Sequence, residues 1–155
     1  MNASPSQRTF IHANALIVGE TGLLLRGPSG AGKSALTLEL LSLARQRGDF
    51  ASLIGDDRVS IEASGGRLIA RPHPKIAGLI EARGLGILRL PYEAGGVIHA
   101  IVDLAPDADT HERLPDPATQ KTTLLDISLP RRCIPAWNPY AGATIIDFIQ
   151  LLMQN

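Results

Sequence analysis

The sequence contains one cysteine, few aromatic residues, no net charge and no long apolar run. Its single cysteine, Cys133, cannot form an intramolecular disulfide, which is typical of a reducing compartment. Fifteen basic residues balance fifteen acidic ones, so no overall charge attracts the chain to nucleic acid or to an anionic membrane. No stretch approaches the roughly 20 apolar residues of a membrane span, and residues 1–9 lack the apolar run of a signal peptide. We therefore expect a cytoplasmic protein with neither a nucleic-acid nor a membrane partner.

The length and apolar content of the chain fit a single globular domain. The chain has 155 residues, of which 45% are hydrophobic, so it can bury one core but has no room for a second independent domain. We predict one domain over residues 1–155, with a flexible segment at residues 1–9.

Lysine is also scarce, and one of the three lysines completes a glycine-rich motif. The stretch GPSGAGKS satisfies the pattern G-x-x-x-x-G-K-[ST] of a phosphate-binding loop, or P-loop. In such a loop, backbone N–H groups surround the phosphates at the positive end of the following helix. The lysine reaches the β- and γ-phosphates, and the hydroxyl of the last residue binds Mg²⁺. The predicted nucleotide-binding residues are therefore Gly27, Pro28, Ser29, Gly30, Ala31, Gly32, Lys33 and Ser34.

The segments around this motif predict the strand, loop and helix that a P-loop requires. Residues 10–18 and 23–26 are apolar and flank a glycine-containing turn, which predicts a strand hairpin. From Ser34 to Arg47 the leucines recur at helical spacing, and Gly48 follows as a stop signal. No N-K-x-D pattern, which would read guanine, is present, so we expect ATP with Mg²⁺.

The rest of the chain predicts a mixed α/β fold. Residues 74–91 begin with a helix-like pattern and become rich in glycine, which predicts an ordered loop at their end. Residues 105–120 are rich in proline and acidic residues, which predicts a long mobile loop. The other predicted elements are strands at 50–57, 96–104, around 122–129 and around 132–137, a hairpin at 58–72 and a helix at 143–153.

Two consecutive carboxylates, Asp56 and Asp57, follow a predicted buried strand. A strand next to the P-loop strand delivers its carboxyl end to the γ-phosphate, where an acid can organise Mg²⁺. Because side chains alternate along a strand, one carboxylate can face the metal and the other an incoming hydroxyl. The alternative is a simple turn in which these residues form a salt bridge with Arg58.

Four motifs together resemble the catalytic domain of bacterial HPr kinase/phosphorylase: IHANAL, GPSGAGKS, IGDDRV and LIEARGLGIL, in this order. The resemblance implies a P-loop-containing, PEP carboxykinase-like core with a mixed sheet and flanking helices. It implies an ATP-dependent kinase of a serine on the phosphocarrier protein HPr, with phosphorolysis as a second activity, in control of the phosphotransferase system and of carbon and nitrogen metabolism. It also implies a hexamer in which residues near the C-terminal helix dock HPr.

The resemblance further assigns roles to individual residues. It makes Asp57 the residue that accepts the serine proton, with Asp56 beside it and Glu81 as a further Mg²⁺ ligand. His12 matches a functional histidine of the family, although Ala13 stands where the family usually has glycine. Arg113 falls where the family has an arginine on a mobile loop near the phosphates.

These three outer residues each have an alternative role. Glu81 could form a surface ion pair with Arg83, His12 could be a core histidine, and Arg113 could be a solvated loop charge. His73, His99 and His111 have no partner pattern and are expected to be structural.

The sequence departs from the family in two places. Full-length members have an additional N-terminal domain, which we expect this chain to lack. The segment 134–142 contains no arginine or lysine, whereas the family has a basic run there that is linked to dephosphorylation. Kinase activity is therefore the stronger expectation. The alternatives are a small-molecule P-loop kinase and a non-catalytic ATP-binding sensor.

Overall fold

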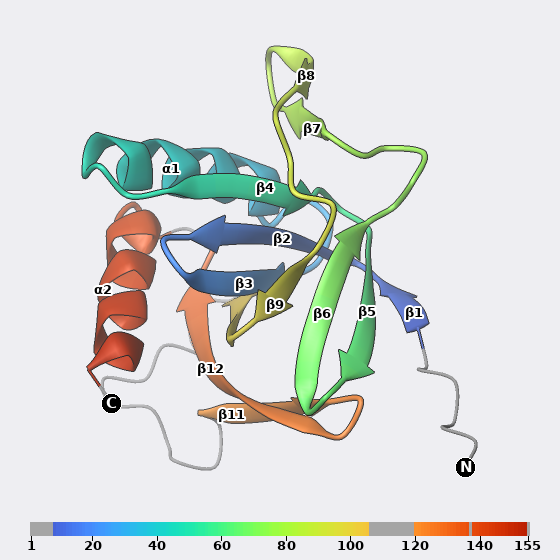
Figure 1. The fold of residues 1–155 in the computed structure, drawn as a ribbon. Helices are drawn as coiled ribbons and strands as arrows, with labels where there is room; N and C mark the ends of the chain where they lie inside the picture. Colours follow the sequence, from blue (N-terminus) through green and yellow to red (C-terminus); the bar gives the residue numbers. More distant parts are fainter. Residues whose placement is uncertain (1–7, 106–119, 137, 155) are drawn as a thin grey trace.

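The fold is built on a six-stranded mixed sheet (Figure 1). The computed structural model describes residues 8–105, 120–136 and 138–154. The strands of this sheet are β2 (Ala13–Val18), β3 (Thr21–Arg26), β4 (Ala51–Gly55), β10 (Ala100–Ala105), β11 (Lys121–Leu124) and β12 (Ile127–Pro135). Their order is β11-β12-β10-β3-β2-β4, in which β10 pairs in parallel with β3 and β12 and the other pairs are antiparallel.

Two helices cover one face of this sheet. They are α1 (Lys33–Gln46) and α2 (Ala141–Met153), close to the predicted helices at 34–47 and 143–153. Leu40 of α1 and Ile145 of α2 are fully buried in the same cluster as Leu23 and Val102 of the sheet. Burial of each such leucine or isoleucine stabilises the fold by about 1.5–3 kcal/mol. Packing thus accounts for most of the apolar surface of α2, and only its last turn exposes large apolar side chains, Leu151 and Met153.

A smaller sheet packs on the opposite face. Its strands are β1 (Arg8–Ile11), β5 (Val59–Ser64), β6 (Arg67–Pro72) and β9 (Gly96–Ile98), in the order β1-β5-β6-β9. The β5–β6 hairpin closes at Gly65 and Gly66, as predicted. Leu24 and Ile101 point from the large sheet into the core that Ile61, Leu68 and Ile98 of the small sheet complete.

Two predicted strands are each divided at a histidine. Residues 10–18 form part of β1 and all of β2, with His12 between them, and residues 96–104 form β9 and most of β10, with His99 between them. At both points the chain passes from one sheet to the other. Alternation of apolar residues continues through such a crossing, so the sequence pattern does not reveal it.

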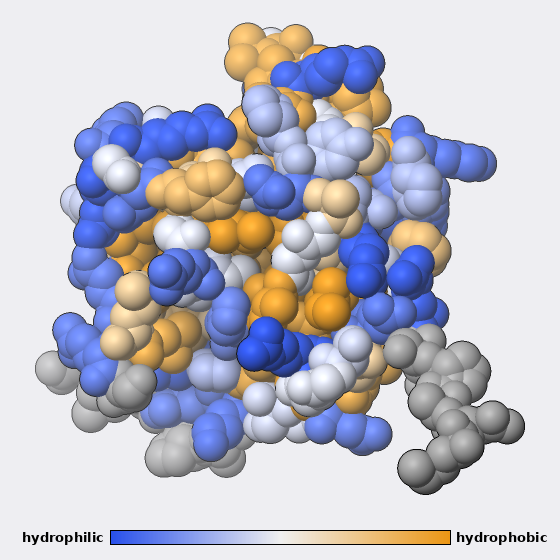
Figure 2. All heavy atoms as spheres, viewed as in Figure 1, coloured by the Kyte–Doolittle hydropathy of each residue, from blue (hydrophilic) through white to orange (hydrophobic). Residues whose placement is uncertain are grey.

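The predicted helix and loop at residues 74–91 are wrong. This segment forms a hairpin of β7 (Leu79–Ala82) and β8 (Gly86–Arg89), which projects from the fold (Figure 1) while Ile80 at its base is buried in the core. Ile80 and Ala82 are buried while Glu81 between them is exposed, which is the period of a strand. Leu85 and Ile87 are exposed near the tip, where Figure 2 shows an apolar surface.

The two short strands expected around 122–129 and 132–137 are arranged differently. A turn at Leu125 and Asp126 ends β11, and β12 then continues through Pro135 as one strand. The predicted loop at 105–120 lies almost wholly outside the described residues. Neither helix in the described part of the chain is long and apolar enough to cross a membrane.

Candidate active site

The P-loop connects the end of β3 to the start of α1, as the motif requires. Gly30 and Gly32 have φ values of 84° and 94°, a left-handed conformation that side chains disfavour. Gly32 is the N-cap of α1, so the loop presents its backbone at the positive end of that helix. The sequence therefore places glycine where this curled backbone needs it.

Lys33 is buried, and its ammonium points back into the loop. The Nζ atom donates to the carbonyl oxygens of Gly27 and Pro28 at 2.7 and 3.3 Å, and it lies 3.2 Å from Nε2 of His12. Burial lowers the pKa of Lys33, whereas the charges of Asp57 and Asp56 act in the opposite direction. A phosphate bound in the loop would thus contact the Lys33 ammonium, which the loop carbonyls already hold in position.

Asp56 is a buried carboxylate that accepts three hydrogen bonds. Its Oδ1 accepts from Ser34 Oγ at 2.6 Å and from Asn14 Nδ2 at 2.8 Å, and its Oδ2 accepts from the backbone N–H of Glu81 at 3.1 Å. These donors fix the carboxylate beside the P-loop hydroxyl. The oxygen atoms of Ser34 and Asp56 form a hard donor set that suits Mg²⁺, which keeps waters and phosphate oxygens as its other ligands.

Asn14 is a site residue that sequence reasoning missed. It is fully buried in β2 and donates to Asp56 and to Thr37 Oγ1, while its own oxygen accepts from the backbone N–H of Asp57 at 2.8 Å. It therefore joins β2, α1 and the end of β4. The available signal was a polar residue inside the apolar run of residues 10–18.

Asp57 is exposed whereas Asp56 is buried, because of a turn in the backbone rather than because of strand alternation. β4 ends at Gly55, and Asp57 has a φ of 65° in the turn that follows, which aspartate tolerates at a cost of about 1 kcal/mol. The Asp57 side chain is 62% exposed. Arg58 closes this turn through its backbone N–H on Asp56 O. Among the described residues, Asp57 Oδ1 contacts His12 Nδ1 at 3.2 Å and forms no salt bridge with Arg58.

His12 lies between Lys33 and Asp57. Its Nε2 is 3.2 Å from Lys33 Nζ, and its Nδ1 is 3.2 Å from Asp57 Oδ1. Because an ammonium only donates, Nε2 accepts from Lys33, and Nδ1 carries the proton that faces Asp57. The alternative that His12 is a core histidine is wrong, since its side chain is 48% exposed.

The β7–β8 hairpin supplies the outer wall of the site. A cavity of about 360 Å³ is lined by P-loop residues, Asp56 and Asp57, and by Glu81 and Arg83 from this hairpin. Among the described residues, no ion pair joins Glu81 to Arg83, so both charges face the cavity without neutralising each other. Arg113 lies outside the described residues.

The fold and the site together define a P-loop protein of the mixed α/β class. Residues 4–154 match the model of the HPr Serine kinase C-terminal domain family. The chain therefore belongs to this family, as its motifs had indicated.

Relatives and a solved structure agree with this assignment. The chain is 29% identical over 158 residues to an HPr kinase/phosphorylase of Malacoplasma penetrans, a match that covers 96% of this chain and 49% of that protein. It is 34% identical over 140 residues to one of Geobacillus thermodenitrificans, covering 82% and 42%. The chain thus spans about half the length of the curated relatives it matches. The structure of an Hpr(Ser) kinase/phosphatase from Coxiella burnetii superimposes with a TM-score of 0.76 at 25% identity, over 95% of this chain and 99% of that chain.

Proposed function

We propose that this protein is an ATP-dependent serine kinase that phosphorylates the phosphocarrier protein HPr. One observation carries the proposal: Lys33, His12 and Asp57 form a continuous chain of contacts at the mouth of the P-loop. These contacts place the Lys33 ammonium, which can bind a phosphate, close to the exposed Asp57 carboxylate, which can accept a proton from a hydroxyl. The names of the relatives, kinase/phosphorylase and kinase/phosphatase, support the same reaction.

The buried part of the site would bind the triphosphate. Backbone N–H groups of the loop and the Lys33 ammonium would hold its phosphates, while Ser34 and Asp56 would hold Mg²⁺ with Glu81 as a further ligand. When bound, Mg²⁺ neutralises charge on the phosphates. Arg113 is proposed, on the family resemblance, to approach the phosphates as well.

The exposed part of the site would bind the acceptor. The HPr serine hydroxyl gives its proton to Asp57 as its oxygen bonds to the γ-phosphorus, and the bond to the departing ADP oxygen breaks. The Nδ1–H of His12 orients the Asp57 carboxylate for this role. With a 62% exposed side chain, Asp57 is accessible to a serine carried on another protein.

Phosphorolysis of phosphorylated HPr would need a second cation for the attacking inorganic phosphate. Arg83 favours this reverse reaction, because it lines the P-loop cavity and forms no ion pair among the described residues. Hexameric assembly, a cytoplasmic location and a role in controlling the phosphotransferase system are proposed on the resemblance.

The test is transfer of label from ATP to HPr. The protein is incubated with γ-labelled ATP, Mg²⁺ and purified HPr, and we expect acid-stable label on a serine. Asp57→Asn should lower the rate about 10²- to 10⁴-fold, because the proton acceptor is lost, while ATP binding is kept. Lys33→Ala should lose both binding and transfer.

Asp126→Asn is the matched control for Asp57→Asn. Asp126 is also exposed, also has a φ of 65°, and lies in the distant β11–β12 turn, so this substitution should change neither binding nor transfer. Label on a metabolite instead of HPr would favour the small-molecule kinase. ATP binding with no transfer to either acceptor would favour the sensor.

A further inference from the structure

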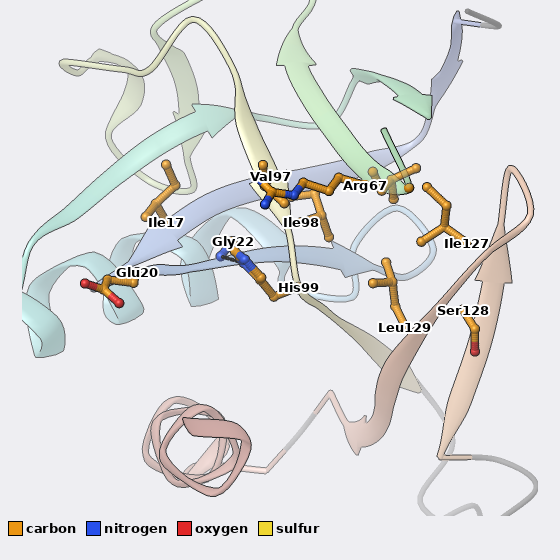
Figure 3. A pocket seen from close by; sticks show the side chains of 12 residues that line it. Ile17, Glu20, Gly22, Arg67, Val97, Ile98, His99, Ile127, Ser128 and Leu129 are labelled. Carbon is orange, nitrogen blue, oxygen red and sulfur yellow. Dashed lines mark hydrogen bonds between the residues drawn. The ribbon is translucent and has the colours of Figure 1, made fainter. Parts of the chain in front are cut away.

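A second cavity lies at the opposite end of β3 from the P-loop. Its volume is about 640 Å³, within the usual range for small-molecule sites, and it shares no lining residue with the P-loop cavity. Both sheets contribute to it: Ile17 and Gly22 come from the large sheet, and Leu68 and Val97 from the small one (Figure 3). Figure 2 shows apolar surface in the middle of this face, bordered by hydrophilic residues.

A close crossing of two strands shapes this cavity. A Cβ atom on Gly22 would lie 1.9 Å from the carbonyl oxygen of Val97, so β9 can cross β3 here only because residue 22 is glycine. The backbone N–H of His99 donates to Gly22 O at 2.8 Å. Backbone contacts between β3 and the segment from Val97 to His99 therefore hold this side of the cavity in place.

His99 presents a hydrogen-bond donor at this crossing. Its Nδ1 accepts from the backbone N–H of Gly22 at 3.0 Å, so the neutral ring carries its proton on Nε2. Burial lowers the pKa of His99, and the charge of Arg67 lowers it further. The ring is therefore neutral at physiological pH and offers one N–H.

Arg67 is the cation of this cavity. Its side chain extends from β6 toward Val97 and Ile98 of β9 (Figure 3). Among the described residues it forms no ion pair, although Glu20 lines the same cavity at the end away from Ile127. Glu20 offsets the positive charge of Arg67, so the lining as a whole has no excess of positive charge. A second negative charge on a ligand would therefore gain little attraction, and the lining favours an anion with one charge over an anion with two.

We propose that this cavity binds a small monocarboxylate with an apolar body. The carboxylate accepts from the Arg67 guanidinium and from Nε2–H of His99, and the body packs on Ile17, Val97 and Leu129. This site is independent of the proposed kinase function, because it shares no residue with the P-loop site.

The probe is sodium octanoate, added to the ¹⁵N-labelled full chain and followed by NMR. We expect saturable shifts at the amides of Gly22, Ile98 and Leu129, with no shift at Gly30 or Gly32. Arg67→Gln should weaken binding about fivefold or more, and Glu20→Gln should tighten it. Arg89→Gln is the matched control, since Arg89 is exposed on β8 and no residue of the β7–β8 hairpin lines this cavity, so it should leave affinity unchanged.

Three further probes separate the head group from the body. Acetate should bind at least about tenfold more weakly than octanoate, because it lacks the apolar body. Octylammonium and octyl phosphate should also bind more weakly. Equal affinity for octylammonium, tighter binding of octyl phosphate, or an unchanged affinity in Arg67→Gln would overturn the proposal. All three substituted residues are exposed, and the NMR spectrum itself reports whether each variant is folded.

Discussion

Asp56 follows the edge strand β4 and Asp103 lies in β10, which two strands separate from β4 in the same sheet, and the two carboxylates accept hydrogen bonds from different kinds of donor. Asp103 in β10 accepts two hydrogen bonds from Arg26, at 2.7 and 2.8 Å, and another from Arg131. Asp56 accepts only from neutral groups, namely a serine hydroxyl, an asparagine amide and a backbone N–H. Two guanidinium groups neutralise Asp103, whereas the hydrogen bonds of Asp56 leave its charge available to a cation.

The pKa of Asp103 reflects this pairing. Burial by itself would raise the pKa, but the hydrogen bonds and charges of Arg26 and Arg131 outweigh burial and lower it. The pKa of Arg26 is raised in turn, first by its hydrogen bond to Asp103. Because Arg26 immediately precedes the P-loop, this cluster ties the loop to β10 and β12. Its role is structural, whereas the role proposed for Asp56 is chemical.

The largest difference between the two carboxylates should appear in transfer to HPr. Asp56→Asn removes the charge beside Ser34 and should lower the rate at least about 10²-fold, as losses of charge stabilisation do. Asp103→Asn should change the rate less than about fivefold at a temperature where it is folded. Initial rates of transfer at saturating Mg²⁺ measure the effect of each substitution. Equal losses of rate in the two variants would show that the two carboxylates do not differ in role.

The second difference should appear in stability. Breaking a buried ion pair costs about 3–5 kcal/mol, and because the Asp103 side chain is 20% exposed we expect a loss of about 2–3 kcal/mol in Asp103→Asn. Urea unfolding measures this. The control is Asp49→Asn, whose contact with Arg47 is exposed and 4.0 Å long, and which should cost less than about 0.5 kcal/mol. A loss for Asp103→Asn as small as the control's would show that the cluster is not structural.

The smallest difference concerns acid pH. The unfolded Asp103 carboxyl titrates near a pKa of about 3.9, and its folded pKa is lower. The unfolded state thus binds the proton first, so the stabilisation is complete above the unfolded pKa and is lost as pH falls through the folded pKa. Unfolding measured from pH 7 downward should show a gap between wild type and Asp103→Asn that narrows below about pH 4.

Another carboxylate with a lowered pKa, Glu62, does not account for this narrowing of the stability difference. The pKa of Glu62 is also lowered, first by its hydrogen bond from Arg71, but it titrates equally in both proteins and cancels from the comparison. A gap of constant size down to the lowest measurable pH would contradict the assignment to Asp103.

Local patterns predicted much of the site. The GPSGAGKS motif fixed the loop, the helix after it and the position of Lys33, because glycine conformation and helix start signals act within a few residues. The Asp56–Asp57 pair was recognised beside the strand that carries it. The His12 position came from the family resemblance, and the structure brings it within 3.2 Å of both Lys33 and Asp57.

Features that depend on distant contacts were missed. The β7–β8 hairpin was predicted as helix and loop. Its two strands pair only with each other, and the burial of Ile80 in the core is a distant contact that spacing does not show. Asn14 was not identified, because its hydrogen-bond partners lie in α1 and after β4, far from it in the sequence. Different surroundings for Asp56 and Asp57 were expected from strand alternation, but they come from a left-handed turn after β4, in which the backbone N–H of Asp57 donates to Asn14.

The sequence by itself determined the phosphate-binding loop, the α/β class and the family. Each of these depends on residues that are adjacent along the chain or follow a fixed spacing. Only the tertiary structure decided which carboxylate is paired with guanidinium groups, since Arg26, Asp103 and Arg131 lie on three strands that meet only in the sheet. It also decided where the second cavity lies, because that cavity exists only where β9 crosses β3 at Gly22. Electrostatic pairing and the shape of a cavity depend on distances in space, which the order of residues does not specify.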